Sequence, residues 1–250
     1  MKFQNDIYPF FTSKKFSTDL KVNLKNDEDM LLDRISMLEK LTKNKKIIHL
    51  GCCDHVDLIN EKIIANVFLH ERLYKNCNRC LGIDINTKGI EILKKSLKYN
   101  DVFSADIIND QISEIMEDTW DYLLLGEVLE HINDPIGFLN KIRTRYEGVL
   151  KKILVTVPNA FSYRNIKYSL KNLECINSDH KYWFTPYTLA KVITESGIQV
   201  SNYWLCDPYN FENKNIYRDF RTCAFFEKFL LKRHPIFRST IIMEGIIIED

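Results

Sequence analysis

The chain has 250 residues, enough for one α/β domain with a substantial core and a small appended subdomain. Its 35 basic residues nearly cancel its 34 acidic ones, so it lacks the overall basic field typical of proteins that bind nucleic acids or anionic membranes. No apolar run reaches the length of a membrane span. Seven irregularly spaced cysteines are typical of reduced thiols, and we expect a cytoplasmic protein.

Along the chain, short apolar runs alternate with segments of helical periodicity. The first predicted helix covers 27–43, where leucine and isoleucine recur at helical spacing. The predicted strands are 47–50, 79–84, 102–106, 121–126, 152–157, 198–205 and 240–248, and the clearest later helices are 88–99 and 186–196. Strands and helices that alternate in this way predict a parallel sheet with right-handed crossovers.

The stretch 120–135 holds the strongest functional signal. An apolar run without strict alternation ends at Gly126 and is typical of a strand buried on both faces. Glu127, Glu130 and His131 follow it, and Asp134 before a proline predicts the start of a helix. Because ligands bind at the carboxyl ends of strands in open α/β sheets, we predict that this segment forms the floor of an active site.

Two other strand ends carry residues suited to a nucleoside. Gly51 follows the first strand, where a residue without a β-carbon allows a tight turn and a close ligand, although an ordinary strand-to-helix turn would explain it equally well. Asp84 ends the second strand, where an acidic residue can accept hydrogen bonds from ribose hydroxyls. The distance between the two residues exceeds the usual ~20 positions, so we predict an insertion over 56–76.

These elements resemble the class I methyltransferases that use S-adenosylmethionine. The resemblance covers about 45–205 and rests on the segments 47–54, 81–84, 104–106, 120–131 and 157–159. It implies a Rossmann-like, mostly parallel seven-stranded α/β sheet with helices on both faces and an antiparallel last strand. The implied division is an arm and helix over 1–44, a methyltransferase core over 45–206, and a substrate cap with the final strand over 207–250.

The resemblance also implies cofactor contacts. Gly51 and Cys52 would line the methionine part of S-adenosylmethionine, Asp84 would hold the ribose, and Ile85 would also contact the cofactor. Asp106 and Ile107 would lie at the adenine, and Leu125, Gly126 and Glu127 would pass beneath the sulfonium. The chain departs from the family pattern in its first loop, where it has Gly51 alone instead of two or three glycines.

The segments 158–162 and 179–186 resemble methyltransferases found with bacterial surface-polysaccharide genes. This likeness implies O-methylation of a sugar or nucleotide-activated sugar in capsule biosynthesis. The alternatives are an N-methyltransferase of a small amino-alcohol phosphate, an RNA 2′-O-methyltransferase, which the balanced charge disfavours, and a non-catalytic cofactor-binding domain. The aromatic-rich segment 207–235 would suit a substrate cap or a homodimer contact equally well.

A hydroxyl acceptor must lose its proton, and His131 and His180 are the candidate catalytic bases because imidazole titrates near neutral pH. His131 could instead make a helix-cap or interdomain hydrogen bond. A second hypothesis is that Glu127, Glu130, His131 and His180 bind a divalent cation such as Mg²⁺, as in some small-RNA 3′-end methyltransferases that share the Glu-x-x-Glu-His pattern. Glu130 could instead pair with a lysine or cap a backbone amide.

Overall fold

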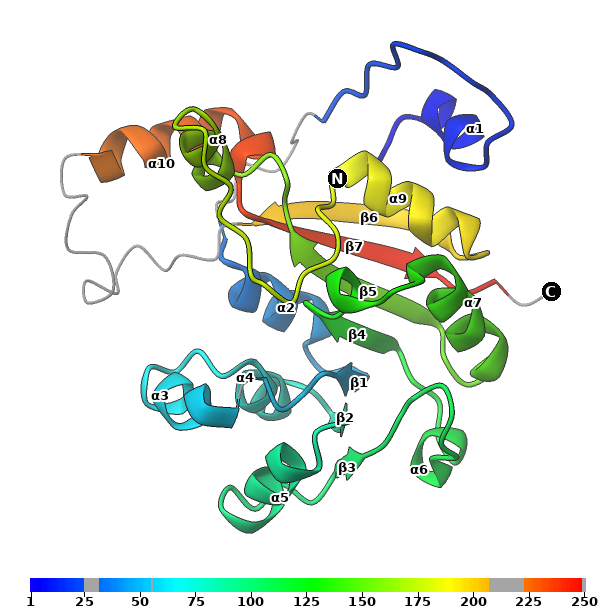
Figure 1. Ribbon diagram of the computed structural model, residues 1–250. Coiled ribbons are helices and arrows are strands. Elements are labelled where there is room, and N and C mark those ends of the chain that lie inside the picture. Colours follow the sequence, from blue (N-terminus) through cyan, green and yellow to red (C-terminus); the bar gives the residue numbers. More distant parts are fainter. Residues whose placement is uncertain (25–31, 55, 207–222, 249–250) are drawn as a thin grey trace.

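A seven-stranded sheet forms the centre of the computed structural model, which describes residues 1–24, 32–54, 56–206 and 223–248 (Figure 1). The strands are β1 (Lys46–Leu50), β2 (Arg79–Asp84), β3 (Val102–Ser104), β4 (Tyr122–Gly126), β5 (Lys152–Pro158), β6 (Gln199–Cys206) and β7 (Thr240–Ile246). Their order is β3-β2-β1-β4-β5-β7-β6. The strands β1 to β5 pair in parallel, and β7 is antiparallel to both of its neighbours. The predicted Rossmann-like sheet is therefore confirmed.

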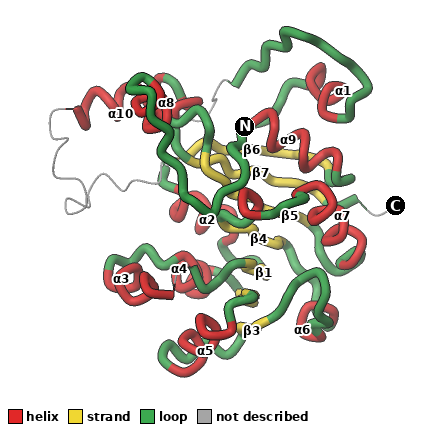
Figure 2. The backbone as a smooth tube through the Cα atoms, viewed as in Figure 1, coloured by secondary structure: helices red, strands yellow, loops and turns green. Residues whose placement is uncertain are grey.

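Helices cover both faces of the sheet (Figure 2). The α-helices are α1 (Tyr8–Phe11), α2 (Arg34–Thr42), α3 (Ile59–Ile64), α4 (Leu69–Asn76), α5 (Thr87–Lys95), α6 (Ser113–Met116), α7 (Pro135–Arg145), α8 (Tyr163–Ser169), α9 (Pro186–Glu195) and α10 (Cys223–Arg233). The 3-10 helices are η1 (Asn5–Ile7), η2 (Val56–Leu58), η3 (Leu129–His131) and η4 (Pro235–Phe237). The insertion predicted over 56–76 contains η2, α3 and α4.

The side chains of the parallel strands divide between two apolar clusters because successive residues of a strand point to opposite faces. Ile48 and Leu123 belong to the larger cluster, which includes residues of α6, α7 and α9. Ile47 and Leu124 belong to the other, which includes residues of α2 and α4. Burial on both faces explains why these strands read as continuous apolar runs.

The strand order places a topological switch point between β1 and β4. The chain continues from β1 to β2 on one side, whereas β4 pairs with the opposite side of β1. Successive connections therefore lead away from each other at the carboxyl ends of these two strands, and this divergence opens the crevice in which α/β proteins bind ligands.

Several predicted elements are longer than the observed ones, and three of them show why. The helix predicted over 27–43 begins at Arg34, where the side chain of Asp33 accepts a hydrogen bond from Ser36 N, while 25–31 lie outside the described residues. The helix predicted over 88–99 ends at Lys95, and Lys98 adopts a left-handed φ of +61°. The strand predicted over 102–106 ends at Ser104 because the carboxylate of Asp106 caps a turn.

The N-terminal segment packs against the far edge of the sheet. Phe3 stacks on Tyr203 of β6, with 4.5 Å between ring centroids, and Phe11 contacts the ring of Tyr187 in α9.

Of the segment 207–235, for which a cap or dimer contact was predicted, 207–222 lie outside the described residues. None of the helices in the described part of the chain combines the length and the apolar character needed to cross a membrane.

Candidate active site

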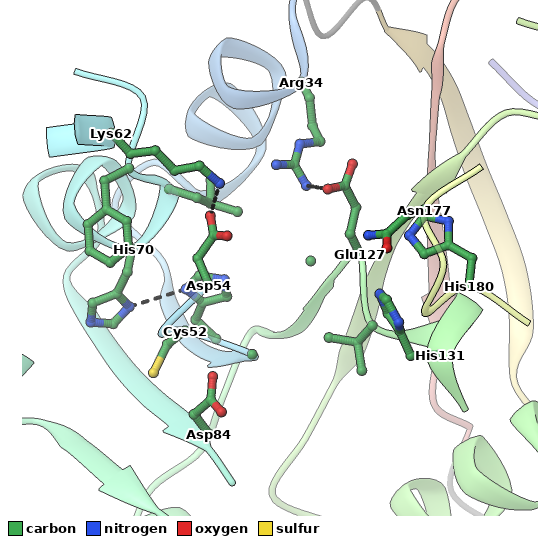
Figure 3. Close-up of a pocket in the computed structure, with 16 residues that line it drawn as sticks. Arg34, Cys52, Asp54, Lys62, His70, Asp84, Glu127, His131, Asn177 and His180 are labelled. Carbon is green, nitrogen blue, oxygen red and sulfur yellow. Dashed lines mark hydrogen bonds and ion pairs between the residues drawn. The ribbon is translucent and has the colours of Figure 1, made fainter. Parts of the chain in front are cut away.

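A cavity of about 280 Å³ lies at the carboxyl ends of β1, β2 and β4 (Figure 3). The predicted site residues among its walls are Gly51, Cys52, Asp84, Gly126, Glu127, His131 and His180. The structure therefore brings together, on one sheet edge, residues from the three strand ends that the sequence analysis selected.

The turn after β1 forms one wall of this cavity. Gly51 has a φ of +75°, and a β-carbon there would lie 2.9 Å from Cγ2 of Val128. The backbone N–H groups of Gly51 and Cys52 both donate to the carbonyl of Ile83, at 2.9 and 3.3 Å. Both the left-handed backbone and the close approach of Val128 therefore require glycine at position 51.

Two cysteines follow Gly51, and neighbouring glycines leave room for them. A β-carbon at Gly82 would lie 2.9 Å from the sulfur of Cys52, and one at Gly89 would lie 2.7 Å from Cβ of Cys53. The side chains of the two cysteines therefore occupy room that Gly82 in β2 and Gly89 in α5 leave open by having no β-carbon. This explains how the loop keeps its path with a single glycine.

Asp84 connects the ends of β1 and β2. Its Oδ2 accepts a hydrogen bond from Cys53 N at 3.0 Å, and its Oδ1 accepts one from Asn86 N at 2.9 Å. Each carboxylate oxygen can accept a further bond, and Asp84 lines the cavity. The residue can thus hold the turn and still accept a hydroxyl from a ligand.

The other residues predicted to contact the cofactor lie outside the lining of this cavity. Ile85 is 78% exposed, whereas Ile107 and Leu125 are buried in the core. The carboxylate of Asp106 accepts hydrogen bonds from the backbone of Ile108 and from both the backbone and the side chain of Asn109. Their predicted contacts with the cofactor stay predictions.

Two buried histidines form the back of the cavity. Nδ1 of His49 in β1 lies 3.2 Å from Nδ1 of His70 in α4, so one ring donates to the other. Burial lowers the pKa of His70 to about 4. Burial and the neighbouring His70 hold the pKa of His49 well below its usual value. Both imidazoles are therefore neutral near pH 7.

A cluster of Glu130, His131 and His180 closes the other end of the cavity. Glu130 is fully buried, and neither carboxylate oxygen has a hydrogen-bond partner in the described part of the chain. Burial raises the pKa of Glu130 to about 8. Nε2 of His180 lies 4.0 Å from Oε1 of Glu130, and the rings of His131 and His180 meet edge to face at 4.7 Å. A buried carboxylate without a partner is costly, so this position suits a ligand that can bind it.

Residues 179–182 reach this cluster from a distant part of the sequence. The backbone N–H of Lys181 donates to the carbonyl of Glu130 at 2.9 Å, and its ammonium donates to the carbonyl of His131 at 2.7 Å. The hydroxyl of Tyr182 donates to the carbonyl of Asn133 at 2.7 Å. These bonds hold His180 against η3.

The geometry of the cluster fits a divalent cation. The candidate ligand atoms of Glu130, His131 and His180 all lie within 4.8 Å of one another. Ligands at the usual ~2.0–2.2 Å from a cation lie somewhat closer together, so a small inward shift would suffice. Nδ1 of His131 lies 3.1 Å from the carbonyl of Asp179. Because a carbonyl only accepts, Nδ1 carries the proton and Nε2 offers its lone pair, as in most metal-binding histidines.

Glu127, the fourth predicted ligand, lies outside this three-residue group. Its Oε2 is instead 3.3 Å from Nη1 of Arg34 in α2. A second group, Cys52, Cys53 and Asp84, has similar spacing. Burial holds the pKa of the Cys52 thiol well above its usual value, so this thiol stays protonated and does not suit a cation.

A second cavity, of about 380 Å³, adjoins the first. Glu127, Asn177 and His180 line both cavities, so they form the junction between them. The rest of the second cavity is lined by amide and hydroxyl side chains, one indole and one guanidinium, together with a proline, a cysteine and an isoleucine. These residues are Asn159, Ser162, Arg164, Asn165, Trp183, Ser239 and Thr240, with Pro158, Cys175 and Ile176.

Among the residues of the first cavity that sequence reasoning missed are Arg34, His49 and His70. A polar residue within the buried strand 47–50 was an available signal for His49. Arg34 and His70 lie in helical segments, where nothing local distinguishes an arginine or histidine that faces a cavity from one on the surface.

The family model of the methyltransferase domain matches residues 25–202, more than half of the chain. No curated protein matches its sequence. Among solved structures, magnesium protoporphyrin IX methyltransferase from Synechocystis PCC 6803, with bound S-adenosylhomocysteine, is 10% identical, has a TM-score of 0.51, and is aligned over 85% of this chain and 81% of its own. The small RNA methyltransferase HEN1 is 14% identical, has a TM-score of 0.51, and is aligned over 92% of this chain and 28% of its own.

The chain therefore belongs to the methyltransferase-domain family. At these identities the two structures show the fold alone, and this is the Rossmann-like methyltransferase fold. The protein is an S-adenosylmethionine-dependent methyltransferase.

Proposed function

We propose that this methyltransferase transfers the methyl group of S-adenosylmethionine to a hydroxyl of a sugar, with a divalent cation held by Glu130, His131 and His180. The observation that carries the proposal is the buried, unpaired carboxylate of Glu130 between two imidazoles. His180 lies at the junction of the two cavities. A divalent cation bound here would contact carboxylate oxygens that have no hydrogen-bond partner in the described part of the chain.

Each cavity has a role in this proposal. The first would hold the donor, with its ribose at Asp84, its methionine moiety along the turn at Gly51, and its sulfonium above Gly126. The second would hold the acceptor, so that the hydroxyl approaches the methyl group at the junction. Alignment of the two reactants in this way accounts for much of the rate of an in-line displacement.

The reaction is balanced without any further reactant. The hydroxyl oxygen forms a bond to the methyl carbon while the bond from this carbon to sulfur breaks, and S-adenosylhomocysteine leaves as a neutral thioether. A bound divalent cation would orient the acceptor oxygen and lower the pKa of its hydroxyl, whose proton would pass to solvent water. Without a cation, His131 and His180 could accept the hydroxyl proton.

The walls of the second cavity favour a sugar over an amino-alcohol phosphate. Amide and hydroxyl side chains suit a neutral polyol, and the ring of Trp183 offers an aromatic face to the apolar side of a sugar. Arg164 could contact a phosphate at the edge of such a ligand. A nucleotide-activated sugar combines these features. A place in capsule or surface-polysaccharide synthesis follows only from the resemblance of 158–162 and 179–186.

The test is methyl transfer from labelled S-adenosylmethionine to a panel of nucleotide sugars, RNA oligonucleotides and amino-alcohol phosphates. We expect label on a sugar hydroxyl, loss of transfer in EDTA, and recovery with Mg²⁺ or Mn²⁺. The assays with RNA oligonucleotides test whether the methylated sugar is the terminal ribose of an RNA or part of a free nucleotide sugar. Transfer to an amine, or an unchanged rate in EDTA, would refute the proposal.

His180→Ala should lower turnover by at least about 100-fold, because it removes either a cation ligand or a base, while binding of S-adenosylhomocysteine changes little. His234→Ala is the matched control, because His234 is exposed and lies outside the lining of both cavities. Equal turnover of the two variants would remove His180 from the mechanism.

A further inference from the structure

Arg34 and Glu127 form an ion pair between the two ends of the first cavity, with Nη1 and Oε2 3.3 Å apart. Figure 3 shows this pair between the group that contains Cys52 and Asp84 and the group that contains His131 and His180. Both partners line the cavity. The pair therefore lies between the proposed donor site and the proposed cation site.

The backbone of Glu127 is fixed, whereas its side chain has room to move. Glu127 has a left-handed φ of +59°, and its N–H donates to both the carbonyl and the hydroxyl of Thr156, at 3.0 and 3.1 Å. Its side chain is 39% exposed and lines both cavities. A change of rotamer could thus move the carboxylate toward His131 and His180 without a change in the chain path.

Arg34 is the more enclosed partner, with 18% of its side chain exposed. Nη1 also lies 3.4 Å from the hydroxyl of Thr156, so α2 presents a guanidinium at the end of the cavity next to β4. If the donor extends from Asp84 across Gly51 to Gly126, its amino-acid end lies nearest this guanidinium. That end carries a carboxylate, which an arginine can bind through two parallel hydrogen bonds.

We propose that Arg34 binds the carboxylate of the methionine moiety of the donor, and that the carboxylate of Glu127, released from Arg34, becomes a fourth ligand of the cation held by Glu130, His131 and His180. This inference rests on the proposed function. The donor and the cation should then each tighten the binding of the other. The donor binds Arg34 and frees Glu127 for the cation, and the cation binds Glu127 and frees Arg34 for the donor.

The test is calorimetric titration of the full chain with Mn²⁺, with and without saturating S-adenosylhomocysteine, which binds as product and allows no turnover. We expect the thioether nucleoside to tighten Mn²⁺ binding by about 5- to 10-fold. By thermodynamic linkage, Mn²⁺ must tighten nucleoside binding by the same factor.

Arg34→Gln should weaken nucleoside binding, tighten Mn²⁺ binding in the absence of the nucleoside, and reduce the coupling factor to about one. Glu127→Gln should also abolish the coupling but leave nucleoside binding unchanged or tighter, and it serves if the first variant fails to fold. Lys62→Gln is the matched control, because Lys62 lines the same cavity but pairs with Asp54. It should keep the coupling factor.

The outcomes separate the two proposals. If the unmodified chain binds no Mn²⁺, the cation site of the proposed function is wrong. If Mn²⁺ and the nucleoside both bind but independently, the role of Arg34 and Glu127 alone is wrong. Coupling lost in Lys62→Gln and kept in Arg34→Gln would likewise overturn the inference, because it would assign the carboxylate to Lys62.

Discussion

The two ends of the first cavity differ in how far their polar groups are already paired. At the end formed by β1 and β2, the carboxylate of Asp84 accepts backbone hydrogen bonds with both oxygens, and His49 pairs with His70. At the end formed by η3, both carboxylate oxygens of Glu130 and Nδ1 of His180 have no hydrogen-bond partner within the described ranges. At the first end the carboxylate is paired, although Nε2 of His70 lacks a partner among the described residues, whereas at the other end both oxygens of a buried carboxylate lack one.

The two carboxylates differ in how they affect the stability of the free protein. A paired carboxylate stabilises the free protein and also presents its remaining lone pairs to a ligand. An unpaired buried carboxylate destabilises the free protein, and the cost is recovered only when a cation or proton binds. Four changes test the contrast, from the largest expected effect to the smallest.

The largest effect should come from Glu130→Gln. Loss of the negative oxygen ligand should weaken Mn²⁺ binding and lower turnover by about 100- to 1,000-fold, since even second-layer changes at metal sites cost about 10- to 100-fold. The midpoint of thermal unfolding near pH 7 should stay equal or rise, because burial raises the pKa of Glu130 to about 8 and so costs stability that a neutral amide does not cost. Calorimetry and thermal unfolding check the two effects. A large fall in the midpoint would show that the carboxylate stabilises the free fold.

The second effect is a dependence of stability on pH that arises at His70. Burial lowers its pKa to about 4, whereas in the unfolded chain it is about 6.5. Between these values the unfolded chain binds more protons, so the free energy of unfolding should fall by about 3 kcal/mol as the pH is lowered from 6.5 to 4. Denaturant titrations at several pH values measure this. His70→Gln should make the profile less steep in this window without abolishing its slope, because the buried His49, whose pKa is also lowered, still contributes, and exposed His234→Gln should leave the slope unchanged.

A smaller effect is expected from Asp84→Asn at the paired end. The amide keeps one acceptor oxygen but loses the charge, so one of the bonds from Cys53 N and Asn86 N is weakened. We expect binding of S-adenosylhomocysteine to weaken by about 30-fold, consistent with about 2 kcal/mol for a charged hydrogen bond, and the midpoint of unfolding to fall. Unchanged affinity would exclude Asp84 from the donor site.

The smallest effect should come from Tyr182→Phe, which removes the hydrogen bond to the carbonyl of Asn133. Because this hydrogen bond is exposed, we expect the free energy of unfolding to fall by about 0.5–1 kcal/mol. Turnover should fall by about 3-fold, because the segment that holds His180 against η3 is less firmly bound. Steady-state kinetics measures this. A fall as large as that of His180→Ala would mean that Tyr182 itself contacts the acceptor.

The sequence was informative where structure depends on local pattern. Buried parallel strands appear as apolar runs, and their ends are marked by Gly51, Asp84 and Gly126, so the sheet and one edge of the cavity could be predicted. The grouping of Glu130 with His131 is also local, because both lie in one turn. The contact of His180 with this turn depends on backbone hydrogen bonds between distant segments, and no sequence spacing encodes them.

The orientation of Glu127 could not be predicted for a related reason. Its left-handed backbone is stabilised by Thr156 of the neighbouring strand, and its ion-pair partner belongs to a helix some ninety positions earlier in the chain. In the sequence, the Glu-x-x-Glu-His pattern groups it with Glu130 and His131 as a candidate ligand. The structure instead pairs it with Arg34.

The position of β7 between β5 and β6 has a consequence for the order in which the protein assembles. β5 and β6 cannot complete their pairing until residues after 239 have been synthesised, because both form hydrogen bonds with β7 and not with each other. Until then each has an unpaired edge that can join another chain. A nascent or shortened chain that stops before Thr240 is therefore the form most prone to aggregate.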